Sequence, residues 1–319
     1  MQKLILIVLD GWGIAPPGPG NCITAAKKPY YDSLISKYPH CRLQASGNHV
    51  GLPAHAMGTS EVGHLHMGAG RIVWQPIVRI DHEIKDGSFF KNKQLLQALQ
   101  NVKKNKKTLH LMGLCSDGKV HSALPHLFAL LELAHQQKVQ AVFLHFFADG
   151  RDVPEKSALD YVKKIEDKMT ELGTGKIASV IGRFYAMDRD TNYDRTQKAF
   201  ELLTEGKGFL APNATQAIQD AYRRNDPTDY YIQPECIQQD QKPLATINDG
   251  DTVLFFNTRT DRIRQLIKCF TQDDFPHFKR NKRPRVQFYS FVQTDASIPT
   301  DRCIPLFNPV EIDHNFATT

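Results

Sequence analysis

Five arginines lie in short turns that also carry Asp or Gly. These turns occur in the stretches FADGRDVPEKSA (147–158), GRFYAMDRD (182–190) and FNTRTDR (256–262), and the arginines are Arg151, Arg183, Arg189, Arg259 and Arg262. A guanidinium group binds phosphate or carboxylate through two parallel hydrogen bonds, so several arginines in one crevice suit a ligand that carries both groups. Each arginine alone could instead form a surface ion pair with its neighbouring aspartate. For the whole set we favour a substrate site.

A histidine follows another glycine-containing turn, in LCSDGKVHS (114–122). At such a position His121 can donate and accept a proton near neutral pH, or it can simply bond to the turn. Ser122 is placed to cap the helix expected after it. By itself His121 is a weak indicator of function.

An aspartate follows the apolar run of residues 3–9, KLILIVL, which predicts a strand buried on both faces. A carboxylate at the end of such a strand is partly desolvated and needs a cation or several donors to stay charged. A divalent metal ion at Asp10 meets that need.

Ser60 lies in the glycine-rich stretch MGTSEVGHLHMGAGR (57–71). If Ser60 opens a helix, its hydroxyl lies beside backbone N–H groups that attract anions. A metal shared by Asp10 and Ser60 would lower the pKa of the hydroxyl and make it a nucleophile toward phosphorus. The alternative is an ordinary helix N-cap, and the local sequence leaves both interpretations open.

The elements that must position these residues alternate along the chain. Helices are expected over 29–38, from about Ser60, and from about Val73 into the 80s. Strands are then expected over 108–114, 139–147, 176–182, 252–257 and 285–292, and helices over 121–137, 155–172, 195–206, 214–224 and 262–270. This rhythm predicts an α/β fold with a mostly parallel sheet and helices on both faces. The arginine and histidine turns follow strands, so they should line one crevice.

Length and composition narrow the class of protein. The chain has 319 residues, which predicts two domains or one domain with a large insertion. The apolar run near the start is too short to cross a bilayer, and six cysteines without a CxxC pair indicate a cytoplasmic protein. The basic clusters 103–107 and 279–285 lack interleaved aromatics, so we interpret them as solvated loops. We therefore expect a small-molecule substrate, and neither nucleic acid nor a membrane as partner.

Six ordered motifs together closely resemble the cofactor-independent phosphoglycerate mutases of the alkaline phosphatase superfamily. The motifs are VLDGWG (8–13), MGTSEVGHLHMGAGR (57–71), SDGKVHS (116–122), DGRDVPEKSA (149–158), GRFYAMDRD (182–190) and NTRTDRIRQ (257–265). The resemblance implies interconversion of 3-phosphoglycerate and 2-phosphoglycerate, a step of glycolysis and gluconeogenesis, through a phosphoserine at Ser60. It implies two divalent cations, commonly manganese (Mn²⁺), with Asp10 and Ser60 as ligands of one. The matching substrate-binding residues are His121, Arg151, Asp152, Arg183, Arg189, Arg259 and Arg262.

The resemblance also implies a domain plan. Residues 1–74 correspond to the N-terminal part of an alkaline-phosphatase-like doubly wound domain. Residues 75–290 correspond to an inserted α/β substrate-binding phosphotransferase domain, and residues 291–319 to the start of the return. The family's remaining metal ligands lie in the returning segment, and this sequence stops before them. We therefore expect at most one partial metal site, a chain incomplete for catalysis, and a monomer unless a second chain supplies the segment.

Two residues depart from the family pattern, and two other functions stay open. Thr59 stands where the family usually has Asn, and His66 also replaces Asn and could add a metal ligand. One alternative function is a binding module that holds phosphoglycerate without transferring its phosphate. Another is a metal-dependent phosphatase or phosphomutase of the same superfamily that acts on a different sugar phosphate.

Overall fold

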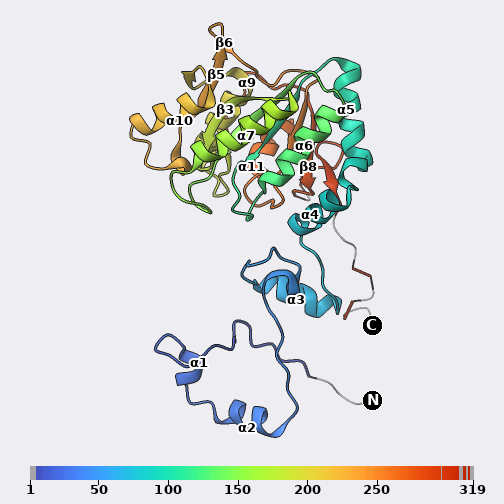
Figure 1. Ribbon diagram of the computed structural model, residues 1–319, viewed down its shortest axis with the longest axis vertical. Helices are drawn as coiled ribbons and strands as arrows, with labels where there is room; N and C mark the ends of the chain where they lie inside the picture. Colours follow the sequence, from blue (N-terminus) through green and yellow to red (C-terminus); the bar gives the residue numbers. More distant parts are fainter. Residues whose placement is uncertain (1–4, 296, 309–311, 314, 317–319) are drawn as a thin grey trace. The chain divides into compact units, whose positions relative to one another are not determined.

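The chain divides into two compact units. The computed structural model describes residues 5–295, 297–308, 312–313 and 315–316. The first unit comprises Met1–Gln75 and Glu311–Thr319, and the second comprises Pro76–Val310. Figure 1 shows the elements of each unit.

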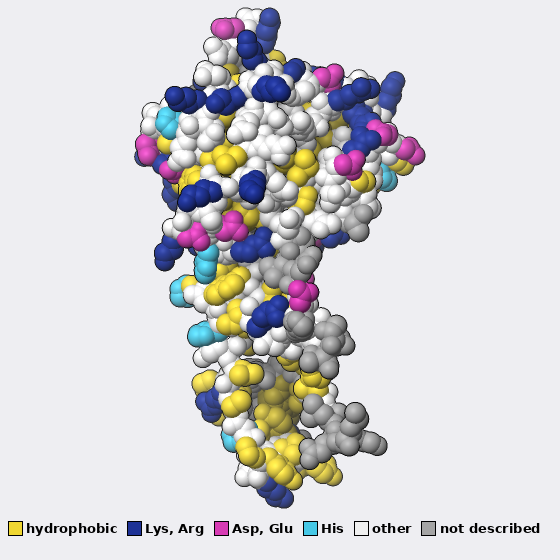
Figure 2. Space-filling model, turned by 90° about the vertical axis from the view of Figure 1, so that its right-hand side faces the viewer, with side chains coloured by type: hydrophobic (Ala, Val, Ile, Leu, Met, Phe, Trp, Pro, Cys, Tyr) yellow, Lys and Arg dark blue, Asp and Glu magenta, His cyan; other side chains and the backbone are white. Residues whose placement is uncertain are grey.

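The described part of the first unit contains short helices joined by extended chain. The helices are α1 (Cys22–Ala25), α2 (Pro29–Lys37), the 3-10 turn η1 (Gly47–Val50) and α3 (Ser60–Ala69). The helices predicted over 29–38 and from Ser60 are therefore confirmed. Pro29 occupies the first position of α2. Proline suits this position because an N–H group there would make no hydrogen bond within the helix. Hydrophobic side chains show over much of this unit's surface in Figure 2.

The apolar run before Asp10 is not a buried strand. Residues 5–9 have no strand assignment, and Ile5 and Ile7 are 82% and 76% exposed; residues 3 and 4 lie outside the described part of the chain. A strand is stable only when neighbouring strands take up its backbone hydrogen bonds. No strand is assigned among the described residues of this unit, so nothing there pairs with the run. The prediction over 3–9 is thus wrong for residues 5–9.

The second unit alternates strands and helices. Its helical elements are α4 (Pro76–Asp86), η2 (Phe89–Lys91), α5 (Lys93–Asn105), α6 (Leu124–Gln136), α7 (Ala158–Leu172), α8 (Arg183–Ala186), α9 (Tyr193–Glu205), α10 (Ala214–Arg223), η3 (Asp229–Tyr231) and α11 (Arg264–Thr271). Its strands are β1 (Leu109–Leu114), β2 (Val142–Ala148), β3 (Lys176–Gly182), β4 (Phe209–Ala211), β5 (Glu235–Gln239), β6 (Lys242–Pro243), β7 (Thr252–Phe255), β8 (Gln287–Val292) and β9 (Ile304–Phe307). None of the described helices is long and apolar enough to cross a membrane.

The strands form one sheet in the order β4-β5-β3-β2-β1-β7-β8-β9, with β6 paired to β5. All neighbours in this order are parallel except β3 and β5, so the predicted mostly parallel sheet is confirmed. The order extends beyond the last strand expected from sequence, because β9 pairs with β8. Residues 304–307 therefore add an edge strand to this sheet.

Helices cover both faces of the sheet, which explains why its strands are apolar at consecutive positions. On one face, Leu111, Leu144 and Val180 pack in the cluster that includes side chains of α5, α6, α7 and α10. On the other face, Met112 and Ile181 pack with side chains of α9 and α11. Successive side chains of a strand point to opposite faces, so a strand covered on both sides is apolar throughout.

A chain of polar side chains crosses the buried sheet from β3 to the start of β7. His110 Nε2 lies 3.3 Å from Asp251 Oδ2, His110 Nδ1 lies 3.0 Å from His145 Nε2, and His145 Nδ1 lies 2.8 Å from Ser179 Oγ. Because the carboxylate can only accept, the network is satisfied when His110 donates to Asp251, His145 donates to His110, and Ser179 donates to His145. All four residues are buried. His145 is neutral in this arrangement, with one ring nitrogen donating and the other accepting.

This network makes the stability of the chain sensitive to acid. Burial, and then the neighbouring His110, lower the pKa of His145 well below 6.5. The unfolded chain takes up a proton at this histidine below about pH 6.5 while the native chain does not. The free energy of unfolding should therefore fall as pH decreases below 6.5, by about 1.4 kcal/mol per pH unit for this group.

Urea unfolding at pH 7.5, 6.5 and 5.5 measures this slope. His145→Asn should have a shallower slope than the wild type by about that amount. His135→Gln, at an exposed histidine, should keep the wild-type slope. Equal slopes for the wild type and His145→Asn would contradict the prediction.

Candidate active site

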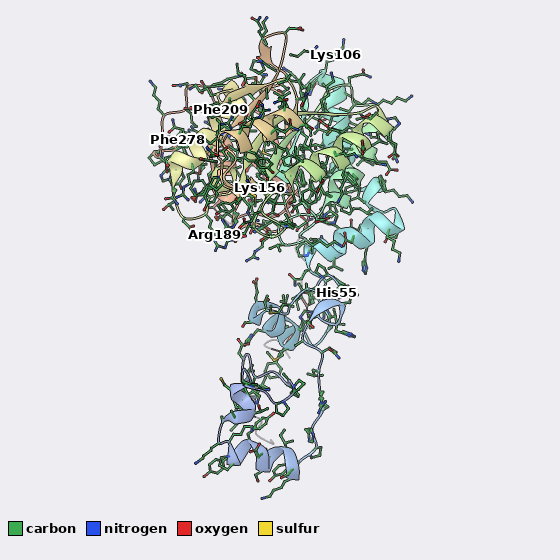
Figure 3. The ribbon with its side chains drawn as sticks, turned by 60° about the vertical axis from the view of Figure 1, so that its left-hand side comes forward. His55, Lys106, Lys156, Arg189, Phe209 and Phe278 are labelled. Atoms are coloured by element: carbon green, nitrogen blue, oxygen red, sulfur yellow. The ribbon has the colours of Figure 1, made fainter. Side chains whose placement is uncertain are left out.

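The polar turns of the second unit follow the carboxyl ends of four neighbouring strands. The turn after β1 carries His121, the turn after β2 carries Asp149 and Asp152, β3 leads directly into Arg183, and β7 leads to the turn of residues 256–262. Parallel strands bring these ends to one edge of the sheet, where open α/β sheets bind ligands. In Figure 3, Arg189 lies at the end of this unit opposite Lys106, which precedes β1. The turns selected from the sequence therefore lie at one edge of the sheet.

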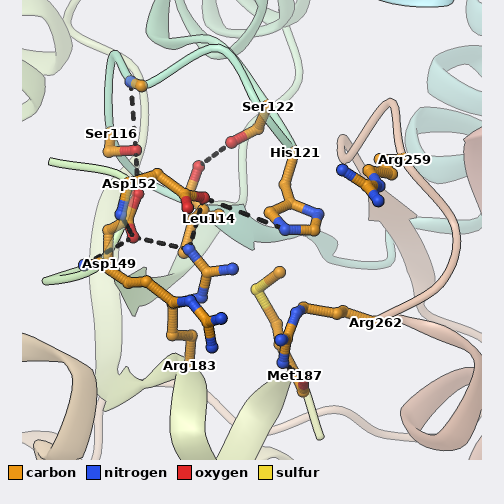
Figure 4. Close-up of polar contacts among 12 residues, drawn as sticks. Leu114, Ser116, His121, Ser122, Asp149, Asp152, Arg183, Met187, Arg259 and Arg262 are labelled. Carbon is orange, nitrogen blue, oxygen red and sulfur yellow. Dashed lines mark hydrogen bonds and ion pairs between the residues drawn. The ribbon is translucent and has the colours of Figure 1, made fainter. Parts of the chain in front are cut away.

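A buried ion-pair cluster lies at this edge of the sheet. We call this region, formed by the turns after β1, β2, β3 and β7, the crevice. The guanidinium Nη1 of Arg183 donates to Asp149 Oδ1 at 2.7 Å and to Asp152 Oδ2 at 2.6 Å (Figure 4). Arg183 is 1% exposed, and Asp149 is 2% exposed. Burial alone would lower the pKa of Arg183, but its hydrogen bond to Asp152 and the charge of Asp149 raise it. Arg183 is therefore a cation held in place, and the carboxylates of Asp149 and Asp152 neutralise most of its charge.

The chain after β2 is shaped to hold this cluster. Asp149 accepts hydrogen bonds from the backbone N–H groups of Arg151 and Asp152 and from the hydroxyl of Ser116 at 2.6 Å. Gly150 has a φ of +61°, and a Cβ there would lie 2.6 Å from the backbone nitrogen of Tyr230. Only glycine meets both conditions without displacing backbone. The DGRD sequence thus encodes the turn as well as the charges.

His121 lies beside this cluster with its ring nitrogens free of close partners. Its Nε2 is 3.9 Å from Asp152 Oδ2 and its Nδ1 is 3.8 Å from Asp261 Oδ1, and Nδ1 is buried without a hydrogen bond to any described residue. Burial, followed by the charge of Arg183, lowers the pKa of His121 despite the opposing charge of Asp261. The imidazole is therefore neutral, and it can donate or accept one hydrogen bond to a ligand.

The main chain around His121 is fixed by its neighbours. The His121 carbonyl accepts a hydrogen bond from the Thr258 N–H at 2.7 Å. Ser122 was expected to cap the following helix, but its hydroxyl donates to the Leu114 carbonyl, and α6 begins only at Leu124. That expectation is therefore wrong, because the serine ties the turn back to β1 instead.

Asp261 forms ion pairs with two further arginines. Its Oδ2 accepts a hydrogen bond from Arg189 Nη1 at 2.8 Å, and its Oδ1 lies 3.2 Å from Arg259 Nε. Burial raises the pKa of Asp261, but the hydrogen bond from Arg189 and the charge of Arg259 outweigh it and lower the pKa. The sequence analysis did not single out this residue, although it lies between two selected arginines in the NTRTDR motif.

Arg262 is the exception among the arginines. It is 7% exposed, and its Nη1 donates to the Met187 carbonyl at 3.3 Å, while no carboxylate in the described chain pairs with it (Figure 4). Burial, and then the positive charges of Arg183 and Arg189, lower its pKa. A desolvated cation beside other cations is unfavourable unless an anion joins it.

Arg151 completes the set from the surface. Arg151 is exposed, and its guanidinium group forms no hydrogen bond or ion pair with any residue the structure describes. Asp149, Asp152 and Asp261 pair with three of the five arginines, so Arg151 and Arg262 have no carboxylate partner among the described residues. The crevice therefore has the charge to hold an anion.

Ser60 lies in the first unit, at the first residue of α3, and is exposed. The N-cap is Thr59, whose hydroxyl oxygen accepts from the Val62 N–H at 3.3 Å. Ser60 is therefore not the N-cap, and its hydroxyl is left for other partners. Thr is a favourable residue at this position because its side-chain oxygen satisfies a free N–H group.

His66 is not available as a metal ligand in this structure. Its Nδ1 bonds to the Val62 carbonyl, and its Nε2 accepts from the Val73 N–H at 2.9 Å. With one ring nitrogen donating and the other accepting, the neutral imidazole has no lone pair left. The expectation that His66 could add a ligand is therefore wrong.

The described residues do not fit a two-metal centre. Asp10 lies in an exposed turn, not at the end of a buried strand. No group of three or more His, Cys, Asp or Glu side chains suited to a metal ion occurs among the residues searched, which are the described ones. Asp10 and Ser60 alone supply one carboxylate and one hydroxyl, too few ligands to hold a divalent ion.

Comparisons with known proteins agree with one another. The family model described as "BPG-independent PGAM N-terminus" matches residues 80–296. The 2,3-bisphosphoglycerate-independent phosphoglycerate mutase of Moorella thermoacetica is 48% identical over 305 residues, which cover 95% of this chain and 59% of that protein. The corresponding mutase 1 of Methanosarcina acetivorans is 48% identical over 306 residues, with coverages of 95% and 59%.

A solved structure extends the likeness to three dimensions. A crystal structure of Leishmania mexicana phosphoglycerate mutase at low cobalt concentration aligns with a TM-score of 0.79 and 32% identity, covering 97% of this chain and 58% of that one. The chain thus spans about three fifths of the length of the curated relatives it matches. On the family model and these relatives, the chain belongs to the 2,3-bisphosphoglycerate-independent phosphoglycerate mutase family.

Proposed function

We propose that the chain acts in the interconversion of 3-phosphoglycerate and 2-phosphoglycerate, with the second unit as its substrate-binding domain. In this proposal the second unit is the inserted domain, and the first unit is part of the phosphatase-like domain that carries the nucleophile. The six free cysteines, two of them exposed, suit a reducing compartment such as the cytoplasm.

The observation that carries the proposal is the nearly buried guanidinium of Arg262, which has no carboxylate partner in the described chain. Its neighbours Arg183 and Arg189 add positive charge, so the crevice is incomplete without an anion. Phosphoglycerate carries a phosphate and a carboxylate, and a guanidinium binds either group through parallel hydrogen bonds.

The other residues have roles that follow from their environments. The neutral His121 would hydrogen-bond a hydroxyl or carboxylate oxygen of the glycerate, and Asp152 would accept from a hydroxyl. Arg151, being exposed, would reach the ligand from the rim. Phosphoryl transfer asks a protein mainly for positioning and charge neutralisation, which such a set supplies.

Ser60 is proposed as the nucleophile. A bond would form between its Oγ and phosphorus as the bond from phosphorus to the C3 oxygen breaks, and the hydroxyl proton of Ser60 would end on the C3 oxygen. In the second transfer the bond from phosphorus to Oγ would break as a bond forms to the 2-oxygen, and the proton of the 2-hydroxyl would return to Ser60. The hydroxyl is available for this role because Thr59 caps α3 in its place. Manganese is the proposed metal of the whole enzyme, by resemblance alone.

Conversion of 3- to 2-phosphoglycerate by the purified chain, with added Mn²⁺ and no bisphosphoglycerate, tests the reaction. Ser60→Ala should abolish any turnover and leave binding of 3-phosphoglycerate intact, because the substitution removes only the group that accepts phosphorus. Ser36→Ala, at an exposed serine of α2, is the matched control. Turnover by Ser60→Ala at the wild-type rate would rule out the proposed nucleophile.

A second function, binding without transfer, is favoured by the lack of a two-metal ligand set in the described residues. Calorimetry with 3-phosphoglycerate separates the two. Binding with no metal-dependent turnover by the folded chain would support the binding module, and no binding at millimolar ligand would remove both functions.

A further inference from the structure

Two arginines and the neutral His121 lie around one carboxylate of the protein. Arg189 donates to Asp261 Oδ2 at 2.8 Å, Arg259 Nε lies 3.2 Å from Oδ1, and His121 Nδ1 lies 3.8 Å from the same Oδ1. All three are among the residues proposed above to bind substrate. The carboxylate of Asp261 therefore stands where those residues would hold an anionic group of a ligand.

The contacts on the Oδ1 side are loose. Asp261 Oδ1 and His121 Nδ1 are both buried, and neither has a hydrogen-bond partner among the described residues. Buried polar atoms normally find partners, so an unpaired donor and acceptor facing each other at 3.8 Å mark an arrangement that a better ligand could replace. The Asp261 side chain is one quarter exposed, so it can turn away from these residues toward solvent.

Arg183 and Arg262 are organised differently. Arg183 is held by Asp149 and Asp152, both anchored on the turn after β2, while Arg262 has only a backbone carbonyl. A ligand group placed at Arg262 meets a cation without a competing carboxylate. A ligand group placed at Arg189 and Arg259 must displace Asp261.

We propose that Asp261 is an internal substitute anion and a specificity-determining residue, which the ligand must displace from Arg189, Arg259 and His121. A ligand with a single anionic group only replaces the Asp261 carboxylate on these residues, so it gains little binding free energy. A ligand with two anionic groups also gains the contact at Arg262, and this gain drives the exchange. Asp261 thereby selects doubly anionic ligands over simple anions such as inorganic phosphate. The inference rests on the proposed function for the identity of the natural ligand.

The test compares inorganic phosphate and 3-phosphoglycerate as ligands of the full chain by calorimetry. Asp261→Asn keeps the shape of the side chain and removes its charge, so Arg189 and Arg259 become free for a simple anion. We expect the affinity for inorganic phosphate to rise about tenfold, and the preference for 3-phosphoglycerate over phosphate to fall.

The control is Asp273→Asn. Asp273 also pairs with two arginines, Arg283 at 2.6 Å and Arg302 at 3.2 Å, but on an exposed surface. This variant changes net charge by the same amount, so it should bind both ligands as the wild type does. A thermal unfolding curve for each variant establishes that it is folded.

The outcomes separate this inference from the proposed function. Tighter phosphate binding by Asp261→Asn supports the role of Asp261 even if wild-type protein fails to bind 3-phosphoglycerate, which would overturn only the proposed function. Unchanged or weaker phosphate binding by Asp261→Asn, including no binding by either protein, overturns the inference. In that case Asp261 serves only to position Arg189 and Arg259.

Discussion

Replacing Arg262 by Met is expected to weaken binding of 3-phosphoglycerate by about 2–4 kcal/mol, a roughly 30- to 1,000-fold rise in Kd. The guanidinium is nearly buried, and it has no carboxylate partner in the described chain. A charge-assisted contact to an anionic ligand in such a place is strong, because water does not compete for it. Calorimetry with 3-phosphoglycerate measures the change.

The same substitution should leave the fold intact. Burial and neighbouring cations already lower the pKa of Arg262, so removing its charge relieves repulsion in the free protein. We therefore expect a Tm equal to or above that of the wild type. Arg264→Met, two residues along at an exposed position, is the control and should bind normally. Equal affinities of the two variants would show that Arg262 only anchors the Met187 carbonyl.

Replacing Arg183 by Met should be the most destabilising change in the crevice. Arg183 is buried and donates to two carboxylates, at 2.7 and 2.6 Å. Its removal leaves Asp149 buried without a counterion, a situation that costs about 3–5 kcal/mol. The free energy of unfolding in urea should fall by about that amount.

Two further variants check the cause of this loss. Adding Asp149→Asn and Asp152→Asn to Arg183→Met should recover much of the stability, because no buried charge is then left unpaired. Arg302→Met breaks an exposed ion pair with Asp273 and should cost less than about 1 kcal/mol. If Arg183→Met costs no more than Arg302→Met, the buried cluster is not a stabilising unit.

The two predictions divide the arginines by function. Arg183 is held by protein carboxylates and so supports the fold as well as the charge of the crevice. Arg262 lacks such a partner in the described chain and is left for a ligand. Arg183 follows a glycine and Arg262 follows Asp261, so the local sequence does not show that Arg183 is the one paired with carboxylates.

Local pattern was sufficient for most of the second unit. Continuous apolar runs such as 108–114 and 176–182 become strands covered on both faces, because both faces must be apolar for the helices to pack. The turns that follow them carry the polar motifs, because a parallel sheet gathers its carboxyl ends at one edge. Strands β4, β5, β6 and β9 were not predicted. Strand β9 is short and contains Pro305, which is tolerated at the edge of a sheet.

Local pattern failed where a residue's role depends on a distant partner. Residues 5–9 are as apolar as β1, yet they are exposed, because a strand needs neighbours that its own sequence does not specify. Ser122 and Ser60 both resemble helix caps in the sequence. In the fold, the Ser122 hydroxyl donates to the Leu114 carbonyl, and Ser60 follows the actual cap, Thr59, by one residue.

By itself, the sequence determined five of the strands, most of the helices, the family, and the set of turns in which the site residues occur, because periodicity and motif spacing are local properties of the chain. It did not predict α5 or the strands β4, β5, β6 and β9. Only the tertiary structure decided which cations are already paired. Asp149 and Asp152, on the turn after a neighbouring strand, form ion pairs with Arg183. Asp261 pairs with Arg189, and Arg262 has no carboxylate partner within the described chain. Ion pairing depends on distance and burial, and these are fixed only when separate strands meet at one edge of the sheet.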